Sequence, residues 1–155
     1  MVGKYFPEMI LLRQMRLYIG YKYTKVQDKE ALVKDLLNFA EELEKAGYCT
    51  FLLGRDVQGW KGSLPLWKTL PAILGNMLKS HAFVAYISSD VSSRGLDVEL
   101  ALSKVLGKNR AVLIKNGISH DAQPSLAEGI VFNDNNDAVQ KVIKKLGSFR
   151  DPISK

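Results

Sequence analysis

A glutamate and a serine-rich segment lie close together between two apolar stretches of the chain. Residues 83–87 and 111–114 are continuous apolar runs, and the polar segment that follows the first begins at Ser88 and leads to Glu99. Hydroxyl groups and free backbone N–H groups bind sugars and phosphates, and a carboxylate beside them can attack an anomeric carbon. The pattern therefore predicts a site in which Glu99 attacks or stabilises the reacting carbon of a sugar.

The segment before Glu99 supplies hydroxyls, a cation and a glycine that lets a ligand approach the backbone closely. Residues 96–106 are predicted to be helical, so free N–H groups at the start of that helix favour an anion. Asp97 is a second carboxylate in the first turn, where acids also simply complement the helix dipole. The candidate ligand-binding residues of this segment are Ser88, Asp90, Ser93, Arg94 and Gly95.

Strands and helices alternate along the chain. Apolar runs predict strands at residues 16–20, 48–53, 82–88, 110–115 and 129–132, and helical periodicity predicts helices at 28–46, 65–79, 96–106 and about 135–146. Such alternation produces right-handed crossovers and a mostly parallel sheet. We therefore expect an α/β, flavodoxin-like three-layer sandwich whose five-stranded parallel sheet has the strand order 2-1-3-4-5.

Capping residues mark the ends of several predicted helices. Asp28 is expected to cap the first helix and Gly47 to end it, and Asn135 or Asn136 is expected to cap the last. Pro71 should kink the helix at 65–79, because proline removes a backbone donor and clashes with the preceding turn.

The expected strand order predicts the same site by an independent argument. Ligands of open parallel sheets bind beyond the carboxyl ends of the strands, where the strand order reverses. Here that point lies between the first and third strands, so residues 20–24 should meet residues 88–95. Gly20, Tyr21 and Lys22 thus join the candidate site, with an aromatic ring for a base and an ammonium for a phosphate.

Length and composition predict one globular domain. The 155 residues contain 46% hydrophobic residues, enough for a single core. We expect the domain to span residues 15–150, with 1–14 as an N-terminal extension and 151–155 as a C-terminal tail. No apolar run approaches the roughly 20 residues of a membrane span. The single cysteine, Cys49, excludes an internal disulfide and fits a cytoplasmic location.

The net charge of +6 comes from basic residues that are spread along the chain, which fits either a solvated, mildly cationic surface or a small-molecule ligand that bears a phosphate. No basic helix with interleaved aromatics and no RNA-binding signature is present, so we do not expect nucleic-acid binding. His81 and His120 lie far apart, and no dinucleotide-binding or Walker motif occurs. We therefore expect neither a metal ion nor a cofactor.

The run Ser93-x-Gly95-x-x-x-Glu99-Leu-x-x-(Ser/Ala)-x-x-x-Gly107-Lys108 resembles the nucleoside 2-deoxyribosyltransferase family, which includes the 2′-deoxynucleoside 5′-monophosphate N-glycosidases. The resemblance implies that Glu99 forms a glycosyl-enzyme ester and that Ser93 and Gly95 contact the sugar or its 5′-phosphate. It further implies that Tyr18 lies near the nucleophile. It also implies a homodimer, in which Ser125 is a phosphate ligand inserted by the neighbouring subunit.

The chain departs from this family at the residue that handles the proton of the base. Family members carry an aspartate in the helix before the third strand, and by spacing that position falls near Ile73 here. No carboxylate lies between Asp56 and Asp90. Asp97, Asp90 and Asp56 are the candidates to replace it. The glycine after the first strand is also shifted by one residue relative to the family.

Two alternatives remain open at this point. Ile87-Ser88 and Glu99-Leu100, with Tyr18-Ile-Gly-Tyr21 on the first strand, also resemble TIR domains, whose enzymatic branch uses a glutamate to cleave NAD. Both resemblances assign the cleavage of an N-glycosidic bond to Glu99. The missing aspartate instead favours a non-enzymatic module that senses nucleotides or mediates an interaction.

Overall fold

The computed structural model describes residues 15–60, 66–118 and 129–147. The elements in chain order are β1 (Arg16–Tyr21), α2 (Lys29–Lys45), β2 (Cys49–Leu52), the π-helical turn η1 (Gly54–Gln58), α3 (Leu66–Lys79), β3 (Ala82–Ile87), α4 (Arg94–Val105), β4 (Asn109–Lys115), β5 (Gly129–Phe132) and α5 (Asn135–Leu146). The predicted extension at 1–14 and the tail at 151–155 lie outside the described residues.

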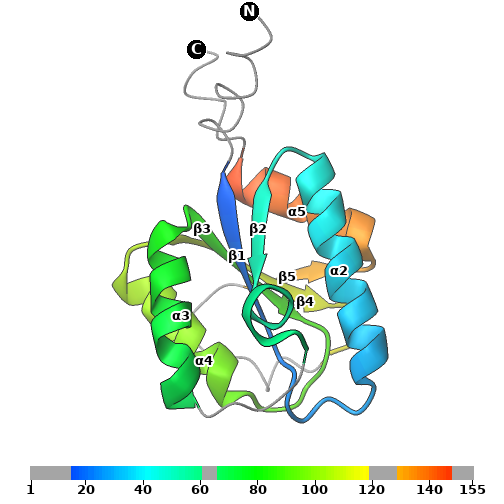
Figure 1. Ribbon diagram of the computed structural model, residues 1–155. Coiled ribbons are helices and arrows are strands. Elements are labelled where there is room, and N and C mark those ends of the chain that lie inside the picture. The colour runs from blue at the N-terminus through cyan, green and yellow to red at the C-terminus, as the bar shows by residue number, and fades with distance from the viewer. Residues whose placement is uncertain (1–14, 61–65, 119–128, 148–155) are drawn as a thin grey trace, which may run out of the picture.

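The five strands form one parallel sheet with the order β2-β1-β3-β4-β5, as the alternation of elements predicts. Helices α3 and α4 cover one face, and α2 and α5 cover the other (Figure 1). The flavodoxin-like three-layer architecture is therefore confirmed. No helix in the described ranges is long and apolar enough to cross a membrane.

Two apolar cores flank the sheet, because alternate side chains of each strand point to opposite faces. Leu17 and Ile19 of β1 pack beneath α2 and α5, whereas Tyr18 packs beneath α3 and α4 together with Phe51 and Phe83. All six residues of β3 are buried, as expected for a central strand that is covered on both faces.

The strand register brings the carboxyl ends of β1 and β3 side by side. Gly20 pairs with Ala85, and Tyr21 pairs with Tyr86. The loops that leave these two strands consequently run next to each other, and Lys25 Nζ donates a hydrogen bond to Ser92 Oγ at 3.2 Å. This is the switch point predicted from the strand order, and it holds the pocket described below.

The helix ends follow the expected capping in part. Asp28 accepts a hydrogen bond from the Ala31 N–H at 3.0 Å, and Gly47 follows α2 with a φ of 102°. The last helix is capped by Asp134 instead of Asn135 or Asn136, because the Asp134 carboxylate reaches the backbone of the first turn. Helix α3 runs on past Pro71, which lies inside it.

Candidate active site

The two predicted carboxylates, Asp97 and Glu99, both lie on α4 but in different surroundings. Helix α4 begins at Arg94, two residues before the predicted start, because the Ser93 hydroxyl accepts a hydrogen bond from the Leu96 N–H at 3.2 Å. Asp97 lies in the first turn and is exposed. Glu99 lies in the second turn on the face that packs against the sheet, where only 5% of it is exposed.

Glu99 is bound by a tyrosine from the neighbouring strand. The Tyr18 hydroxyl donates a hydrogen bond of 2.5 Å to Glu99 Oε2, and the tyrosine itself is fully buried. Burial raises the pKa of Glu99 to about 8, although the Tyr18 hydrogen bond acts in the opposite direction. Burial, and then the nearby Glu99 charge, raise the pKa of Tyr18, so the phenol remains a donor. A buried carboxyl group with so strongly shifted a pKa is typical of a functional site.

Gly20 provides the space that this pair occupies. A Cβ atom at Gly20 would lie 2.6 Å from the Phe83 ring and 3.0 Å from Glu99 Oε1. Gly20 therefore has a packing role, because the bare backbone lets the carboxylate and the aromatic ring approach β1. It is absent from the described pocket lining, and its role in ligand binding stays a prediction. Gly95, by contrast, has open space where a side chain would project.

A pocket of about 590 Å³ opens in front of Glu99. Its lining contains six of the residues singled out from the sequence, namely Tyr21, Ser93, Arg94, Gly95, Asp97 and Glu99. The β1–α2 loop, the β3–α4 loop and α3 all contribute to it. The pocket is large enough for a ligand the size of a nucleotide.

Other predicted residues lie near the pocket without lining it. Lys22 is buried, and its ammonium donates a hydrogen bond of 3.3 Å to the Ser89 carbonyl, so it joins the two loops. Burial lowers the pKa of Lys22, against the attraction of Asp97 and Asp90. Ser88 and Asp90 are absent from the described lining, and Ser125 lies outside the described residues.

Asp97 is a second carboxylate at the pocket. Ile73, the position expected to hold the family aspartate, does line the pocket, but it presents an apolar side chain there. Asp56 is engaged elsewhere, because both of its oxygens accept hydrogen bonds from Arg55 at 3.0 Å. Among the described residues that line the pocket, Asp97 is thus the only carboxylate besides Glu99.

The remaining lining residues come from the two switch-point loops, from α3 and from the region of η1. Tyr23, Thr24 and Ser92 lie within residues 20–24 and 88–95, the segments that the expected topology brings together, and Lys25 directly follows the first of them. Thr69 and Ile73 lie one helical turn apart on the inward face of α3, Leu53 directly precedes η1, and Gln58 is the last residue of η1. Only the folded structure brings α3 and the region of η1 to this pocket.

An aromatic cluster forms one side of the pocket mouth. The rings of Tyr21 and Tyr23 lie 5.8 and 6.2 Å from the Trp60 ring, and the Tyr23 hydroxyl donates a hydrogen bond of 3.1 Å to the Trp60 carbonyl. Trp60 has a φ of 60°, which is rare for a residue with a side chain. The pocket thus combines aromatic faces with cations from Lys25 and Arg94.

The described residues hold no group of three or more His, Cys, Asp or Glu side chains that would fit a metal ion. The groups that the pocket does offer are a buried carboxylate, phenol and serine hydroxyls, and two cations. These groups can bind a polar, anionic ligand and support nucleophilic chemistry on it.

No protein family and no curated protein matches the chain in sequence. Solved structures do resemble it. The solution structure of BlsM is 17% identical, with a TM-score of 0.67, over 92% of this chain and 95% of BlsM. A conserved protein from Enterococcus faecalis V583 is 12% identical, with a TM-score of 0.57, over 84% and 98% of the two chains.

The CMP N-glycosidase BcmB of Clostridium botulinum is 16% identical, with a TM-score of 0.49, over 82% of this chain and 97% of BcmB. The similarity to BcmB is too weak to carry an argument. The other two similarities, at such low identities, support the fold alone.

Proposed function

We propose that the protein cleaves the N-glycosidic bond of a nucleoside or nucleoside 5′-monophosphate in the cytoplasm, with Glu99 as the nucleophile. The observation that carries this proposal is a buried carboxyl group that lines a pocket of about 590 Å³ while a tyrosine holds one of its oxygens. Burying a carboxyl group costs stability, and such a cost is typically retained for chemistry.

The hydrogen bond from Tyr18 gives the two oxygens of Glu99 different roles. The Tyr18 hydroxyl binds Oε2, which leaves Oε1 to form the bond to the anomeric carbon. As that bond forms, the bond from the carbon to the base breaks, and its electron pair leaves with the base. Water then attacks the same carbon and releases the carboxylate; overall the sugar gains OH and the base gains H. The attack requires the ionised form of Glu99, whose population grows as pH rises towards the pKa of about 8. The low dielectric around that carboxylate strengthens its attraction for the oxocarbenium-like transition state.

The basic groups of the pocket favour a phosphorylated substrate. Lys25 and Arg94 are both lining residues, and the Ser93 and Gly95 backbone lies at the N-terminus of α4. Together they provide cations, a hydroxyl and free N–H groups for a 5′-phosphate.

Ile73 favours a second candidate function. An apolar side chain lines the pocket where the resembled family holds a carboxylate, so the pocket of this chain also fits a module that binds nucleotides without cleaving them. Cleavage of NAD, as in enzymatic TIR domains, would use the same glutamate.

The test is to incubate the protein with nucleosides, nucleoside 5′-monophosphates and NAD, and to measure released base by chromatography. The Glu99→Gln variant should lose at least about 1,000-fold of the activity, because the amide cannot form the ester intermediate. Glu41→Gln, which changes an exposed carboxylate on α2, should retain full activity. A thermal shift without base release would favour the sensing module, and release of nicotinamide alone would favour NAD cleavage. Full activity of Glu99→Gln would exclude the nucleophile.

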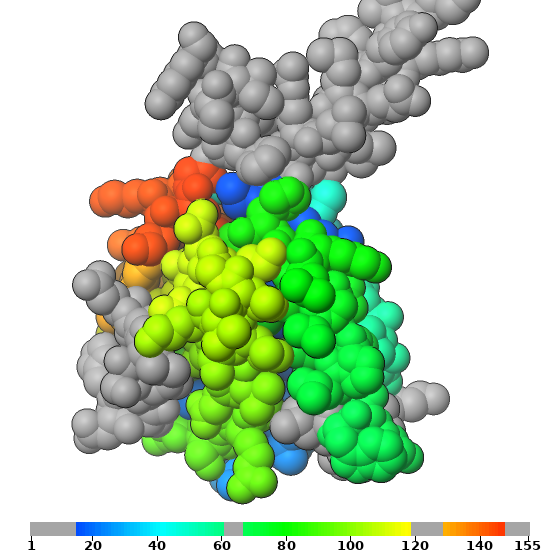
Figure 2. Space-filling view, turned by 90° about the vertical axis from the view of Figure 1, so that its left-hand side faces the viewer, coloured from blue at the N-terminus to red at the C-terminus, as the bar shows by residue number. Residues whose placement is uncertain are grey.

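We also propose a homodimer, with Ser125 of one subunit completing the phosphate site of the other. The outer face of α3 supports an interface, because Trp67, Leu70, Leu74 and Leu78 are exposed along it, with Trp67 71% exposed. Figure 2 shows the side of the molecule on which α3 and α4 lie together. Light scattering should give a mass twice the 17.3 kDa of the chain, and Leu74→Glu should halve it. A parent protein that remains monomeric at high concentration would refute the dimer.

A further inference from the structure

The hydroxyl of Tyr21 accepts one hydrogen bond and can still donate one. It accepts a hydrogen bond of 2.7 Å from the Gly54 N–H. A phenol can accept and also donate, and within the described part of the chain the Tyr21 O–H has no acceptor. Tyr21 also lines the pocket that Glu99 lines, so a ligand there can contact this residue.

Gly54 holds this hydroxyl in place. A Cβ atom at Gly54 would lie 2.4 Å from the Tyr21 oxygen and 2.4 Å from the Trp60 ring, so the tyrosine hydroxyl packs directly against the Gly54 backbone. The ring of Tyr21 is held in turn by the Trp60 and Tyr23 rings. The phenol is therefore oriented before any ligand arrives.

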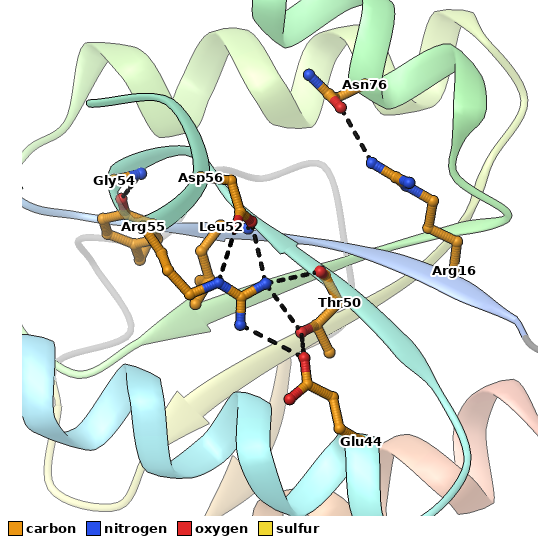
Figure 3. Close-up of polar contacts among 9 residues, drawn as sticks. Arg16, Glu44, Thr50, Leu52, Gly54, Arg55, Asp56 and Asn76 are labelled. Atoms are coloured by element: carbon orange, nitrogen blue, oxygen red, sulfur yellow. Dashed lines mark hydrogen bonds and ion pairs between the residues drawn. The ribbon is translucent and has the colours of Figure 1, made fainter. Parts of the chain in front are cut away.

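The turn that carries Gly54 is itself anchored. Arg55 binds both oxygens of Asp56, the Thr50 carbonyl at 2.8 Å and Glu44 at 3.4 Å, and Asp56 accepts the Leu52 N–H at 2.9 Å (Figure 3). These contacts tie η1 to the end of α2 and to β2.

The chemistry of the pocket leaves a role for such a donor. Glu99 faces the sugar in the proposed reaction, and Ile73 and Leu53 are apolar lining residues with no proton to offer. The phenol of Tyr21 stays protonated at neutral pH, because burial and, to a smaller extent, the Glu99 charge raise its pKa by more than the hydrogen bond from the Gly54 N–H lowers it. It can therefore donate a hydrogen bond throughout the physiological range.

Building on the proposed function, we propose that Tyr21 is a catalytic residue that donates a hydrogen bond to the departing base. A pyrimidine offers its 2-oxo group, and a purine its N3, next to the glycosidic nitrogen. As the bond from the anomeric carbon to the base breaks, negative charge develops on the base, and the Tyr21 O–H stabilises it. Tyr21 keeps its own proton, and the base takes its proton from water.

The test compares Tyr21→Phe with the parent on 2′-deoxyadenosine 5′-monophosphate and on its 3-deaza analogue, which lacks N3. On the first substrate kcat should fall about 100-fold, with KM changed less than about 3-fold. On the analogue the two proteins should differ by less than about 3-fold, because the acceptor is gone. A purely structural role would lower both rates equally, and that result would overturn the proposal.

Two further variants separate this proposal from loss of fold and from the proposed function. Tyr86→Phe removes a tyrosine hydroxyl that lies outside the described pocket lining, on the face of the sheet opposite Glu99, where it donates to Asn135, and should change neither rate. Gly54→Ala should displace the Tyr21 hydroxyl and reproduce the substrate-dependent loss. If Tyr21→Phe is fully active while Glu99→Gln is inactive, the role of Tyr21 is wrong and the nucleophile stands. If the parent releases no base, both proposals fail.

Discussion

At the residue scale, the sequence singles out Glu99 as a candidate, and the fold defines the surroundings of its side chain. The residue type, the serine-rich loop and the position after a buried strand predict a reactive carboxylate. The hydrogen bond from Tyr18 joins residues 81 positions apart, and only the register of β1 against β3 brings them together. Burial, which raises the pKa of Glu99 to about 8, is likewise a product of the packing of α4 on the sheet.

The raised pKa of Glu99 predicts a loss of stability between pH 4.5 and about 8. As pH rises through 4.5, the unfolded chain releases this proton while the folded chain retains it, so the free energy of unfolding falls. The loss is complete once pH exceeds the folded pKa, and it amounts to as much as about 5 kcal/mol. Glu99→Gln cannot ionise and should escape it.

Urea unfolding at pH 4, 6 and 8 checks this expectation. Parent and Glu99→Gln should be nearly equally stable at pH 4, and the variant should be about 2–4 kcal/mol more stable at pH 8. Glu41→Gln, on the exposed face of α2, should show no such pH-dependent gain. A difference between parent and Glu99→Gln that stays constant with pH would contradict the buried, protonated state.

At the element scale, periodicity predicts which elements form, and side-chain caps determine where they begin. Helix α4 starts at Arg94 because the Ser93 hydroxyl reaches the first turn, and α5 starts at Asn135 because Asp134 does the same. The turn η1 had no signal in the sequence beyond a glycine-rich loop. Its shape depends on Arg55, which binds residues of α2 and β2 that are up to 11 positions away.

The close approach of α4 to β1 makes Gly20 sensitive to substitution. In Gly20→Ala the new methyl group would meet the buried Phe83 ring at 2.6 Å and Glu99 Oε1 at 3.0 Å. Overpacking of this kind should cost about 1–3 kcal/mol of unfolding free energy and should displace the carboxylate, lowering activity at least about 10-fold. Chemical denaturation and base-release assays measure the two effects.

Gly75→Ala is the matched control for that experiment. Gly75 lies inside α3 with nothing near the position of a Cβ atom, so alanine there should raise stability by about 0.5–1 kcal/mol and leave activity unchanged. Equal stability of Gly20→Ala and the parent would show that β1 and α4 can separate without cost.

At the scale of the whole molecule, the strand order could be predicted from the alternation of strands and helices along the sequence. Alternating elements of ordinary length fix a parallel sheet, and the sheet order fixes the edge at which the pocket lies. The aromatic cluster could not be predicted in the same way. Tyr21 and Trp60 are 39 positions apart in the numbering, and their contact depends on how β2 leads into η1.

The net charge of the chain and the charges at the pocket predict a salt effect that depends on the substrate. The chain carries +6, and Lys25 and Arg94 line the pocket. A nucleoside 5′-monophosphate is attracted by this field, whereas an uncharged nucleoside is not. Raising ionic strength from about 20 mM to about 500 mM should therefore raise KM for the monophosphate about 5- to 10-fold and change KM for the nucleoside less than about 2-fold.

Two lysine variants assign this salt effect to the pocket or to the overall charge. Lys25→Met removes the cation that hydrogen-bonds Ser92 at the pocket mouth and should abolish most of the salt dependence. Lys34→Met removes an equal charge from the exposed surface of α2 and should leave it nearly intact. If both variants reduce the effect equally, the attraction comes from the whole molecule, and Lys25 has no special part in binding phosphate. If salt acts alike on the nucleoside and its monophosphate, the pocket does not recognise the phosphate.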